Sequence, residues 1–238
     1  MLALLVDTAT AAVTVGVAEF PAPSGDAGSS HVLVRAEHVV VDARRHGEAL
    51  APGIAVALGE AGITVGDLNA VVAGVGPGPF TGLRVGLVTA ASLADALGIP
   101  AYPVCSLDAV VPDPSVRAGR PLLVATDARR REVYWAVYDA AGTRVHGPDV
   151  AKPADLRARL DAGELGAVDD LLAVGSGAAL YADALGLPVA EPLYPSVAGL
   201  ARLGADRVLA KAPAEPLTPM YLRRPDAVEP GAAKSVLR

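Results

Sequence analysis

The sequence is poor in the residues that would place it outside the cytoplasm or in a membrane. It has a single cysteine, Cys105, so no disulfide can form within the chain, which fits a reducing compartment. The apolar start, residues 1–6, is very short and has no basic segment before Asp7 interrupts it, so we expect no signal peptide. No uninterrupted apolar run approaches the roughly 18 residues of a membrane helix. The sequence therefore predicts a cytoplasmic protein without a membrane partner.

Positive charge is also scarce. The formal net charge is −6 and the isoelectric point is about 5.2. These values argue against non-specific nucleic-acid binding by the chain alone, which needs clustered cations. These values do not exclude contact with RNA inside a larger assembly, because arginines cluster at residues 129–131 and 223–224. The alternative, which we favour, is that these arginines are solvated charges of a turn and a tail.

No histidine, cysteine or serine of the sequence has the spacing of a known metal site or catalytic nucleophile. The four histidines form no i,i+4 pair and no His-Glu-x-x-His motif. Cys105 follows an apolar stretch with no histidine nearby and is better explained as a small core residue. The Gly-x-Ser-x-Gly motif of a nucleophile elbow is missing, and Gly175-Ser-Gly177 is too short to replace it. We expect no catalytic residue, no metal and no cofactor.

Apolar residues, 52% of the chain, follow the periodicities of strands and helices in alternation. In the first half this predicts an antiparallel meander with a loop at 21–30, then helices that alternate with strands. Helices between strands indicate parallel pairing. The expected strands are 2–6, 12–18, 32–41, 70–75 and 101–105, and the expected helices are 47–61 and 81–97.

The second half repeats the opening of the first. Strands are expected at 122–126 and 133–138, with Asp127 in the turn where Asp7 stands in the first half. The matching residues share a constant offset of 120 positions, and a later strand at 171–174 echoes the one at 70–75. We interpret this pattern as a duplication that produces two similar lobes. The alternative is a chance likeness between buried strands around an aspartate turn.

Two β-hairpins, each with an aspartate in its turn, resemble the actin-like ATPase and sugar-kinase (ASKHA) superfamily. The predicted fold class is therefore α/β, with two similar lobes that each contain a mixed sheet and helices. We expect an N-terminal lobe at 1–105, a smaller lobe at 106–195 and a Pro-rich tail at 212–238. The helix expected at about 196–211 is a candidate to return to the first lobe.

Nucleotide binding in such a fold needs glycines, since closely approaching backbone N–H groups hold the phosphates. The turn at 7–10 has no glycine, the turn at 127–132 is bulky, and each proline in the loop 76–79 removes a donor. We prefer to interpret both aspartates as turn residues whose carboxylates accept backbone N–H bonds. The candidate remnants of a nucleotide site are Asp7, Thr8, Thr10, Gly76, Gly78 and Asp127.

The most specific motif is residues 72–86, Val-Ala-Gly-Val-Gly-Pro-Gly-Pro-Phe-Thr-Gly-Leu-Arg-Val-Gly. It resembles the signature of the TsaB family, also called YeaZ, of the bacterial tRNA threonylcarbamoyladenosine pathway. Further stretches follow in the order of that family and cover nearly the whole chain. They are residues 5–10, 45–50, 103–108, 126–129 with 132–134, and 221–223.

The resemblance implies a role beside a larger paralogue, TsaD, which carries the transfer chemistry. With TsaE, an ATPase, that assembly attaches threonylcarbamoyl to the adenosine next to the tRNA anticodon. The paralogue holds its metal with a His-x-x-x-His pair, and the positions here are Ser106 and Val110, which cannot replace imidazoles. The paralogues share ancestry with proteins once labelled glycoproteases, so a protease label would mislead.

The two long helices of the first half are apolar around most of their surface, and such helices need burial on more than one side. One stripe can face the sheet, and the rest predicts a surface for a partner. The alternative is a core that covers both helices completely. The expected partner contacts are His46, Leu50, Ile54, Gly82, Arg84, Val85, Val88 and Ser92.

Two functions follow from different classes. The first is a non-catalytic subunit that supports a TsaD-like paralogue, works with a TsaE-like ATPase, reaches tRNA only through the complex and forms a homodimer when alone. The second is a stand-alone actin-fold kinase or hydrolase. Gel filtration with and without TsaD, together with an ATP titration, distinguishes them.

Overall fold

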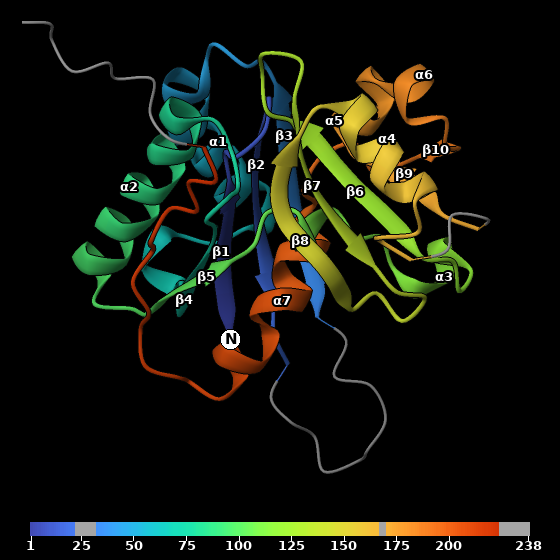
Figure 1. The fold of residues 1–238 in the computed structure, drawn as a ribbon. Helices are drawn as coiled ribbons and strands as arrows, with labels where there is room; N and C mark the ends of the chain where they lie inside the picture. Colours follow the sequence, from blue (N-terminus) through green and yellow to red (C-terminus); the bar gives the residue numbers. More distant parts are fainter. Residues whose placement is uncertain (22–31, 167–169, 224–238) are drawn as a thin grey trace, which may run out of the picture.

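The computed structural model describes residues 1–21, 32–166 and 170–223 (Figure 1). Most of the loop expected at 21–30 and the tail beyond residue 223 lie outside these described residues. Two five-stranded sheets form the centres of two lobes. The predicted α/β class is therefore confirmed.

The first sheet has the strand order β3-β2-β1-β4-β5. Its antiparallel meander consists of β1 (Leu2–Asp7), β2 (Ala12–Glu19) and β3 (Leu33–Val41), as predicted. The strands β4 (Ala70–Gly74) and β5 (Ala101–Val104) continue the sheet parallel to β1. Strands β1, β2 and β4 are buried along nearly their whole length, because helices cover both faces of this sheet.

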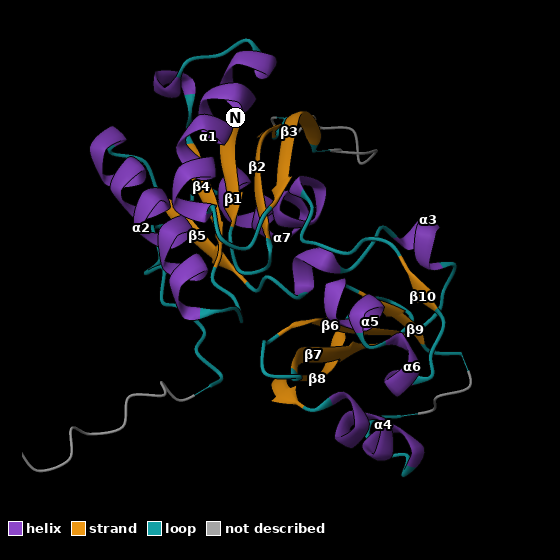
Figure 2. Cartoon of the chain, turned by 90° about the horizontal axis from the view of Figure 1, so that it is seen from above, coloured by secondary structure: helices purple, strands orange, loops and turns teal. Residues whose placement is uncertain are grey.

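Three helices cover the first sheet. Helices α1 (His46–Ala61) and α2 (Phe80–Leu97) lie on one face, and α7 (Val197–Leu209) lies on the other (Figure 2). Gly62 and Gly98 end α1 and α2 in the left-handed conformation that glycine adopts without strain. Helix α7 packs against β1, β2, β4 and β5, so the last helix belongs spatially to the first sheet.

The second sheet repeats this topology, with the order β10-β9-β6-β7-β8. Strand β6 (Leu122–Asp127) pairs antiparallel with β7 (Val133–Tyr138) and parallel with β9 (Leu172–Val174), as β1 pairs with β2 and β4. The prediction of two similar lobes is thereby confirmed.

The outer elements of the second lobe were not predicted. Strand β8 (Arg144–Ala151) contains Gly147 and Pro148, and its pairing with β7 is irregular there, so it lacks a clear alternating pattern. The other missed elements, in both lobes, are short. They are α3 (Pro114–Arg117), α4 (Pro153–Asp161), α5 (Ser176–Leu180), α6 (Ala182–Leu185), β10 (Val189–Ala190) and the 3-10 turns η1 (Val65–Asp67) and η2 (Asp108–Val110). Among them, α4, α5 and α6 pack on one face of the second sheet.

The segment after α7 connects the lobes. The Glu215 N–H donates to Ala101 O at 3.0 Å, and the Met220 N–H donates to Val75 O at 2.8 Å. Arg223 then donates to Ala128 O at 3.2 Å and forms an ion pair with Glu132 in the turn between β6 and β7. The tail therefore runs from the edge of the first sheet to the hairpin of the second.

Candidate functional site

The turn between β1 and β2 holds a buried carboxyl group. Asp7 Oδ1 accepts a hydrogen bond from the Ala9 N–H at 2.8 Å, and Oδ2 accepts one from Ser106 Oγ at 2.5 Å. Ser106 Oγ in turn accepts a hydrogen bond from the Gly76 N–H at 3.0 Å. Both carboxyl oxygens are therefore engaged within the chain, and the bond from the Ala9 N–H is the backbone contact expected of a turn aspartate.

Burial raises the pKa of Asp7 from 3.8 to about 6. The hydrogen bonds from Ser106 and Ala9 and the nearby His46 lower the pKa, but they only partly offset the lost hydration of the carboxylate. Burying the ionised form therefore reduces the stability of the fold at neutral pH.

The loop at 76–79 and the end of β4 pack directly on this turn, so no phosphate can lie between Gly78 and Ala9. A Cβ atom added to Gly78 would lie 2.3 Å from Ala9 O, and one added to Gly74 would lie 1.8 Å from Asp7 Oδ2. The two prolines of the loop offer no N–H donor. A phosphate cradle needs open space and several converging N–H groups, so these residues do not fit a nucleotide phosphate or its magnesium ion.

Helix α2 is held against the same turn. Thr8 Oγ1 donates to Gly82 O at 2.8 Å and accepts from the Gly86 N–H at 3.0 Å. A Cβ atom on Gly86 would lie 2.4 Å from Thr8 Oγ1, so only glycine allows this approach. Thr10 completes the cluster, since its carbonyl oxygen lies 2.8 Å from His46 Nε2.

The structure thus brings together all but one of the predicted nucleotide-site remnants. The exception, Asp127, lies in the second lobe, where its Oδ1 accepts from the Arg129 N–H at 2.9 Å and its carboxylate forms an ion pair with Arg129. The bond from the Arg129 N–H is again the backbone contact expected of a turn aspartate. Tyr134 Oη of this hairpin makes a weak contact of 3.5 Å with Gly78 O of the first lobe.

The turn that follows Asp127 is strained. Arg129, Arg130 and Arg131 have φ angles of 63°, 53° and 62°, all in the left-handed region. This conformation costs roughly 1 kcal/mol or more per residue for L-amino acids. The charge of the arginine run is evident in the sequence, but its left-handed backbone is not, because strained turns normally carry glycine or asparagine.

Metal ligation finds no support in the residues that the structure describes. Within them, no three His, Cys, Asp or Glu side chains come together. Ser106 and Val110, at the positions implied for the ligands of the transferase paralogue, are buried, and the Ser106 hydroxyl is engaged by Asp7. The metal of that paralogue therefore does not fit this chain.

The predicted partner contacts divide into buried and exposed groups. His46 and Leu50 face their own lobe, with 8% and 1% of their surface exposed, so we remove them from the proposed partner surface. The half-buried group, which leans on the core or on the β1–β2 turn, is Ile54, Gly82 and Val85. The exposed group is Arg84, Val88 and Ser92.

The exposed surface of α1 and α2 is mostly apolar or small. Val88 is 63% exposed and Val56 is 40% exposed. Around them lie small exposed residues of both helices, which bring few charges to this surface. We call this surface the helix face and define it by Ala51, Pro52, Ala55, Val56, Gly59, Val88, Ala91 and Ser92.

Helix α2 is also long and apolar enough to cross a membrane by length and composition alone. Arg84 and Asp95 interrupt its apolar residues, so it is not a continuous apolar run in the sequence. One such helix is weak support for a membrane span. The stripe with Leu83, Leu87, Ala90 and Ala94 is buried against the first sheet, so α2 is a covering helix of its lobe.

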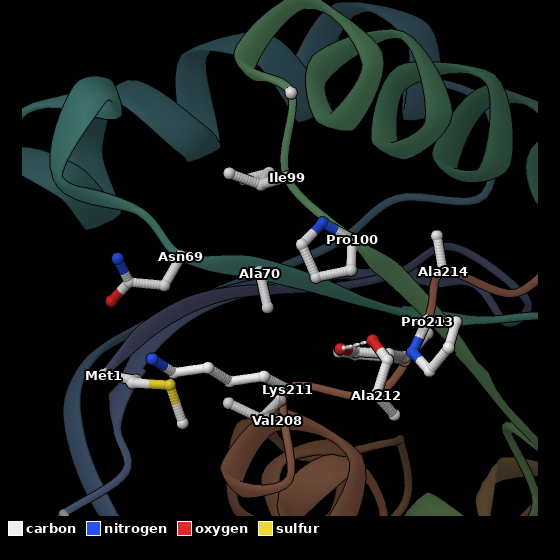
Figure 3. Close-up of a pocket in the computed structure, with 12 residues that line it drawn as sticks. Met1, Asn69, Ala70, Ile99, Pro100, Val208, Lys211, Ala212, Pro213 and Ala214 are labelled. Atoms are coloured by element: carbon white, nitrogen blue, oxygen red, sulfur yellow. Dashed lines mark hydrogen bonds between the residues drawn. The ribbon is translucent and has the colours of Figure 1, made fainter.

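A separate pocket of about 500 Å³ lies at the opposite end of the first sheet (Figure 3). It opens between the starts of β4 and β5 and the segment after α7, where Tyr102 Oη donates to Ala212 O at 2.6 Å. Its walls are mainly apolar, and its polar side-chain groups belong to Lys211, Asn69 and the Tyr102 hydroxyl (Figure 3). The lining contains no acid–base pair and no set of metal ligands.

Two five-stranded lobes of the same topology define an actin-like protein whose first hairpin turn is covered by the chain's own loop at 76–79. The family model described as "TsaD: tRNA N6-adenosine threonylcarbamoyltransferase" matches residues 40–217. The chain therefore belongs to that family and, within it, to the TsaB (YeaZ) group, as the motif at 72–86 predicted.

Individual relatives agree with this placement. YeaZ from Pseudomonas aeruginosa has a similar structure, with a TM-score of 0.69 and 25% identity over 93% of this chain and 99% of that chain. TsaB of Escherichia coli is 33% identical over 52% of this chain and 55% of its own length. Two uncharacterised mycobacterial proteins each match 94% of this chain. The Mycobacterium leprae protein is 46% identical, and the chain spans only 55% of its length; for the Mycobacterium tuberculosis protein the values are 47% and 92%.

The contact between the loop and the turn predicts a stability effect. Replacing Gly78 by alanine forces Ala9 to move, and we expect the free energy of unfolding to fall by about 2 kcal/mol, as for other overpacked sites. Gly59→Ala is the control, because nothing lies within 4 Å of its added Cβ and alanine favours the helix. Urea unfolding followed by circular dichroism measures both. Equal stabilities of the two variants would contradict the packing argument.

Proposed function

We propose that this chain is a non-catalytic subunit that binds a TsaD-type transferase and supports threonylcarbamoylation of the adenosine next to the tRNA anticodon. The observation that carries the proposal is the closed cluster of Asp7, Ser106 and the loop at 76–79. In an actin-like fold this region would hold phosphate and metal, and here it is filled by the chain's own groups.

The helix face supports a partner role. An apolar surface formed by two adjacent helices is typical of a protein interface. By analogy with the relative's fold, the counterpart is the equivalent pair of helices on the transferase, and a second copy of this chain takes that place when the transferase is absent. A TsaE-type ATPase is the further partner we propose, in the cytoplasm, with tRNA reached through the complex.

Binding through this face would act on the conformation of the transferase. A partner shifts a conformational equilibrium only by its differential affinity for the two states. We propose that the chain binds more tightly to the competent arrangement of the transferase lobes, without contributing a reacting group.

The direct test is the activity of the purified chain. Alone, it is expected to show no threonylcarbamoyl transfer, no ATP hydrolysis and no metal-dependent peptidase activity, whereas it should raise the activity of the transferase in a reconstituted mixture. Turnover by the chain alone that is lost in Asp7→Ala would support the alternative, a stand-alone actin-fold kinase or hydrolase.

A further inference from the structure

A small basic pocket lies where the β1–β2 turn and the β6–β7 turn meet the starts of α1 and α2. We call it the arginine mouth. It has a volume of about 250 Å³ and is lined by Thr10, Ala43, His46, Pro79, Phe80, Thr81, Gly82 and Arg129. We propose that the arginine mouth binds one nucleotide unit of tRNA, with a phosphate in the pocket and a base stacked on Phe80. This inference rests on the proposed function, which brings tRNA to the complex.

One arginine lines the pocket, and three more belong to segments that contribute lining residues. Arg129 lines it, Arg44 and Arg45 stand between the lining residues Ala43 and His46, and Arg84 lies one helical turn after Phe80. Two of these arginines are paired, Arg129 with Asp127 and Arg45 with Glu48. Arg84 has no carboxylate partner within the part of the chain that the structure describes. Asp42 Oδ1 accepts from the Arg44 N–H at 2.9 Å, so four arginines stand against the three carboxylates of Asp42, Glu48 and Asp127. The local charge is therefore positive by one, although the chain as a whole is acidic, and this favours an anion.

The rim of the pocket carries exposed aromatic rings. Phe80 is 47% exposed and stacks on Tyr221, which is 38% exposed, with ring centroids 5.2 Å apart. The Arg84 guanidinium lies 3.7 Å from the Phe80 ring centroid, and its Nε–H donates to Tyr221 Oη at 2.8 Å. Exposed rings beside a guanidinium are stacking platforms for unpaired bases. A base and a phosphate thus have adjacent places.

The strained turn presents its arginine to this pocket. Arg129 begins the run of three left-handed residues, and the turn is closed by the Ala128 N–H, which donates to Glu132 O at 2.9 Å. Arg223 braces the turn from outside through Ala128 O and Glu132. Strain of this kind persists only where surrounding contacts hold it, and it concentrates at binding sites.

The N-terminal ends of α1 and α2 also favour an anion in this pocket. Neither α1 nor α2 has a side-chain N-cap, and Thr81 and Gly82 in the first turn of α2 line the pocket. First-turn N–H groups have no partner within their helix and favour an anion. The arginine mouth lies at this end of α2, whereas the helix face continues from Val88 toward the other end. Transferase and RNA can therefore be bound together.

The test uses the complex of the full chain with its transferase and an unmodified tRNA transcript, with affinity measured by fluorescence anisotropy across a salt series. Phe80→Ala is expected to weaken tRNA binding about tenfold, the effect of losing one stacked base, and Phe80→Tyr should restore it. Arg129→Ala should reduce the slope of log affinity against log salt by about one, because one phosphate contact is lost. Arg35→Ala, an exposed arginine of β3 paired with Glu19, is the control and should change neither quantity.

Three outcomes would overturn the proposal. The first is unchanged tRNA affinity and salt slope in both variants. The second is a loss of transferase binding by Phe80→Ala, measured in the same samples by sedimentation, which would make the ring a protein contact. The third is AMP binding as tight as tRNA binding, which would assign the pocket to free nucleotide. If the wild-type chain itself fails to bind the transferase, the proposed function is wrong, and crosslinking of tRNA to the chain alone at low salt then decides about the arginine mouth.

Discussion

Val88→Asp is expected to weaken binding to the TsaD-type transferase about 100-fold or more, with the chain still folded. Val88 is 63% exposed on the helix face, so a carboxylate there is hydrated in the free chain. In an apolar interface the same carboxylate would be buried without a partner, which costs several kcal/mol, and each 1.4 kcal/mol is a factor of about ten in affinity. Isothermal titration against the transferase measures the loss, and reconstituted transfer activity should fall in proportion.

The control for this variant is Val116→Asp. Val116 lies on α3 in the second lobe and is 61% exposed, so the two substitutions have matched chemistry and exposure. Val116→Asp should bind as the wild type does. Excess Val88→Asp protein should restore activity by mass action. A Val88→Asp chain that binds normally yet fails at saturation would show that the subunit acts chemically or on RNA. Unfolding of this variant would place Val88 in the core.

Asp7→Asn is expected to remove a pH dependence of stability worth about 3 kcal/mol. The folded-state pKa of Asp7 is raised to about 6 from 3.8, and one pKa unit corresponds to about 1.36 kcal/mol. Below about pH 4 the group is protonated in both the folded and the unfolded state, so it has no linked effect. Between about pH 4 and 6 the folded state keeps its proton longer, so stability falls as pH rises. Above about pH 6 the carboxylate is ionised in both states, and the fold carries the full cost of burying it.

The measurement compares unfolding free energies of the two chains by urea titration at several pH values. The advantage of Asp7→Asn over the wild type should grow by about 3 kcal/mol from pH 4 to pH 7. Asparagine keeps the acceptor for the Ala9 N–H, and its amide can donate to Ser106 Oγ. A constant difference across this pH range would contradict the burial argument.

A control of opposite sign is available in Asp67→Asn. Hydrogen bonds from Thr64 lower the pKa of this exposed carboxyl, so its contribution is present at neutral pH and is lost as pH falls. Asp67→Asn should therefore lose stability relative to the wild type at neutral pH, and this loss should disappear in acid.

The elements of the first lobe could be predicted because each has a strong local signal. Alternating valines from residue 13 to 17 indicated β2, and Gly98 followed by Pro100 indicated the end of α2. The predicted ends of most elements differ from the observed ones by one or two residues. The outer part of the second lobe lacked such signals. Its helices are four to nine residues long, and β8 is interrupted at Gly147 and Pro148.

The site could be predicted only in part. The prolines at 77 and 79 predicted a loop with few N–H donors for a phosphate, but only the structure shows that Gly78 lies against Ala9. The hydrogen bond between Ser106 and Asp7, 99 positions apart, could not be predicted from any local pattern in the sequence. Phe80 and Tyr221 also meet across a long separation, so neither residue type nor spacing could pair them.

The sequence by itself determined the fold class, the duplication and the family, because hydrophobic period, turn residues and motif spacing are properties of the chain read in order. Only the tertiary structure decided which sides of α1 and α2 are free. His46 and Leu50 turned out to face inward, and Val88 to face solvent, although all three lie in apolar helical stretches. The physical reason is that helical periodicity defines faces but not what packs on them. Burial depends on the neighbouring sheet and on the β1–β2 turn, which approach from distant parts of the sequence.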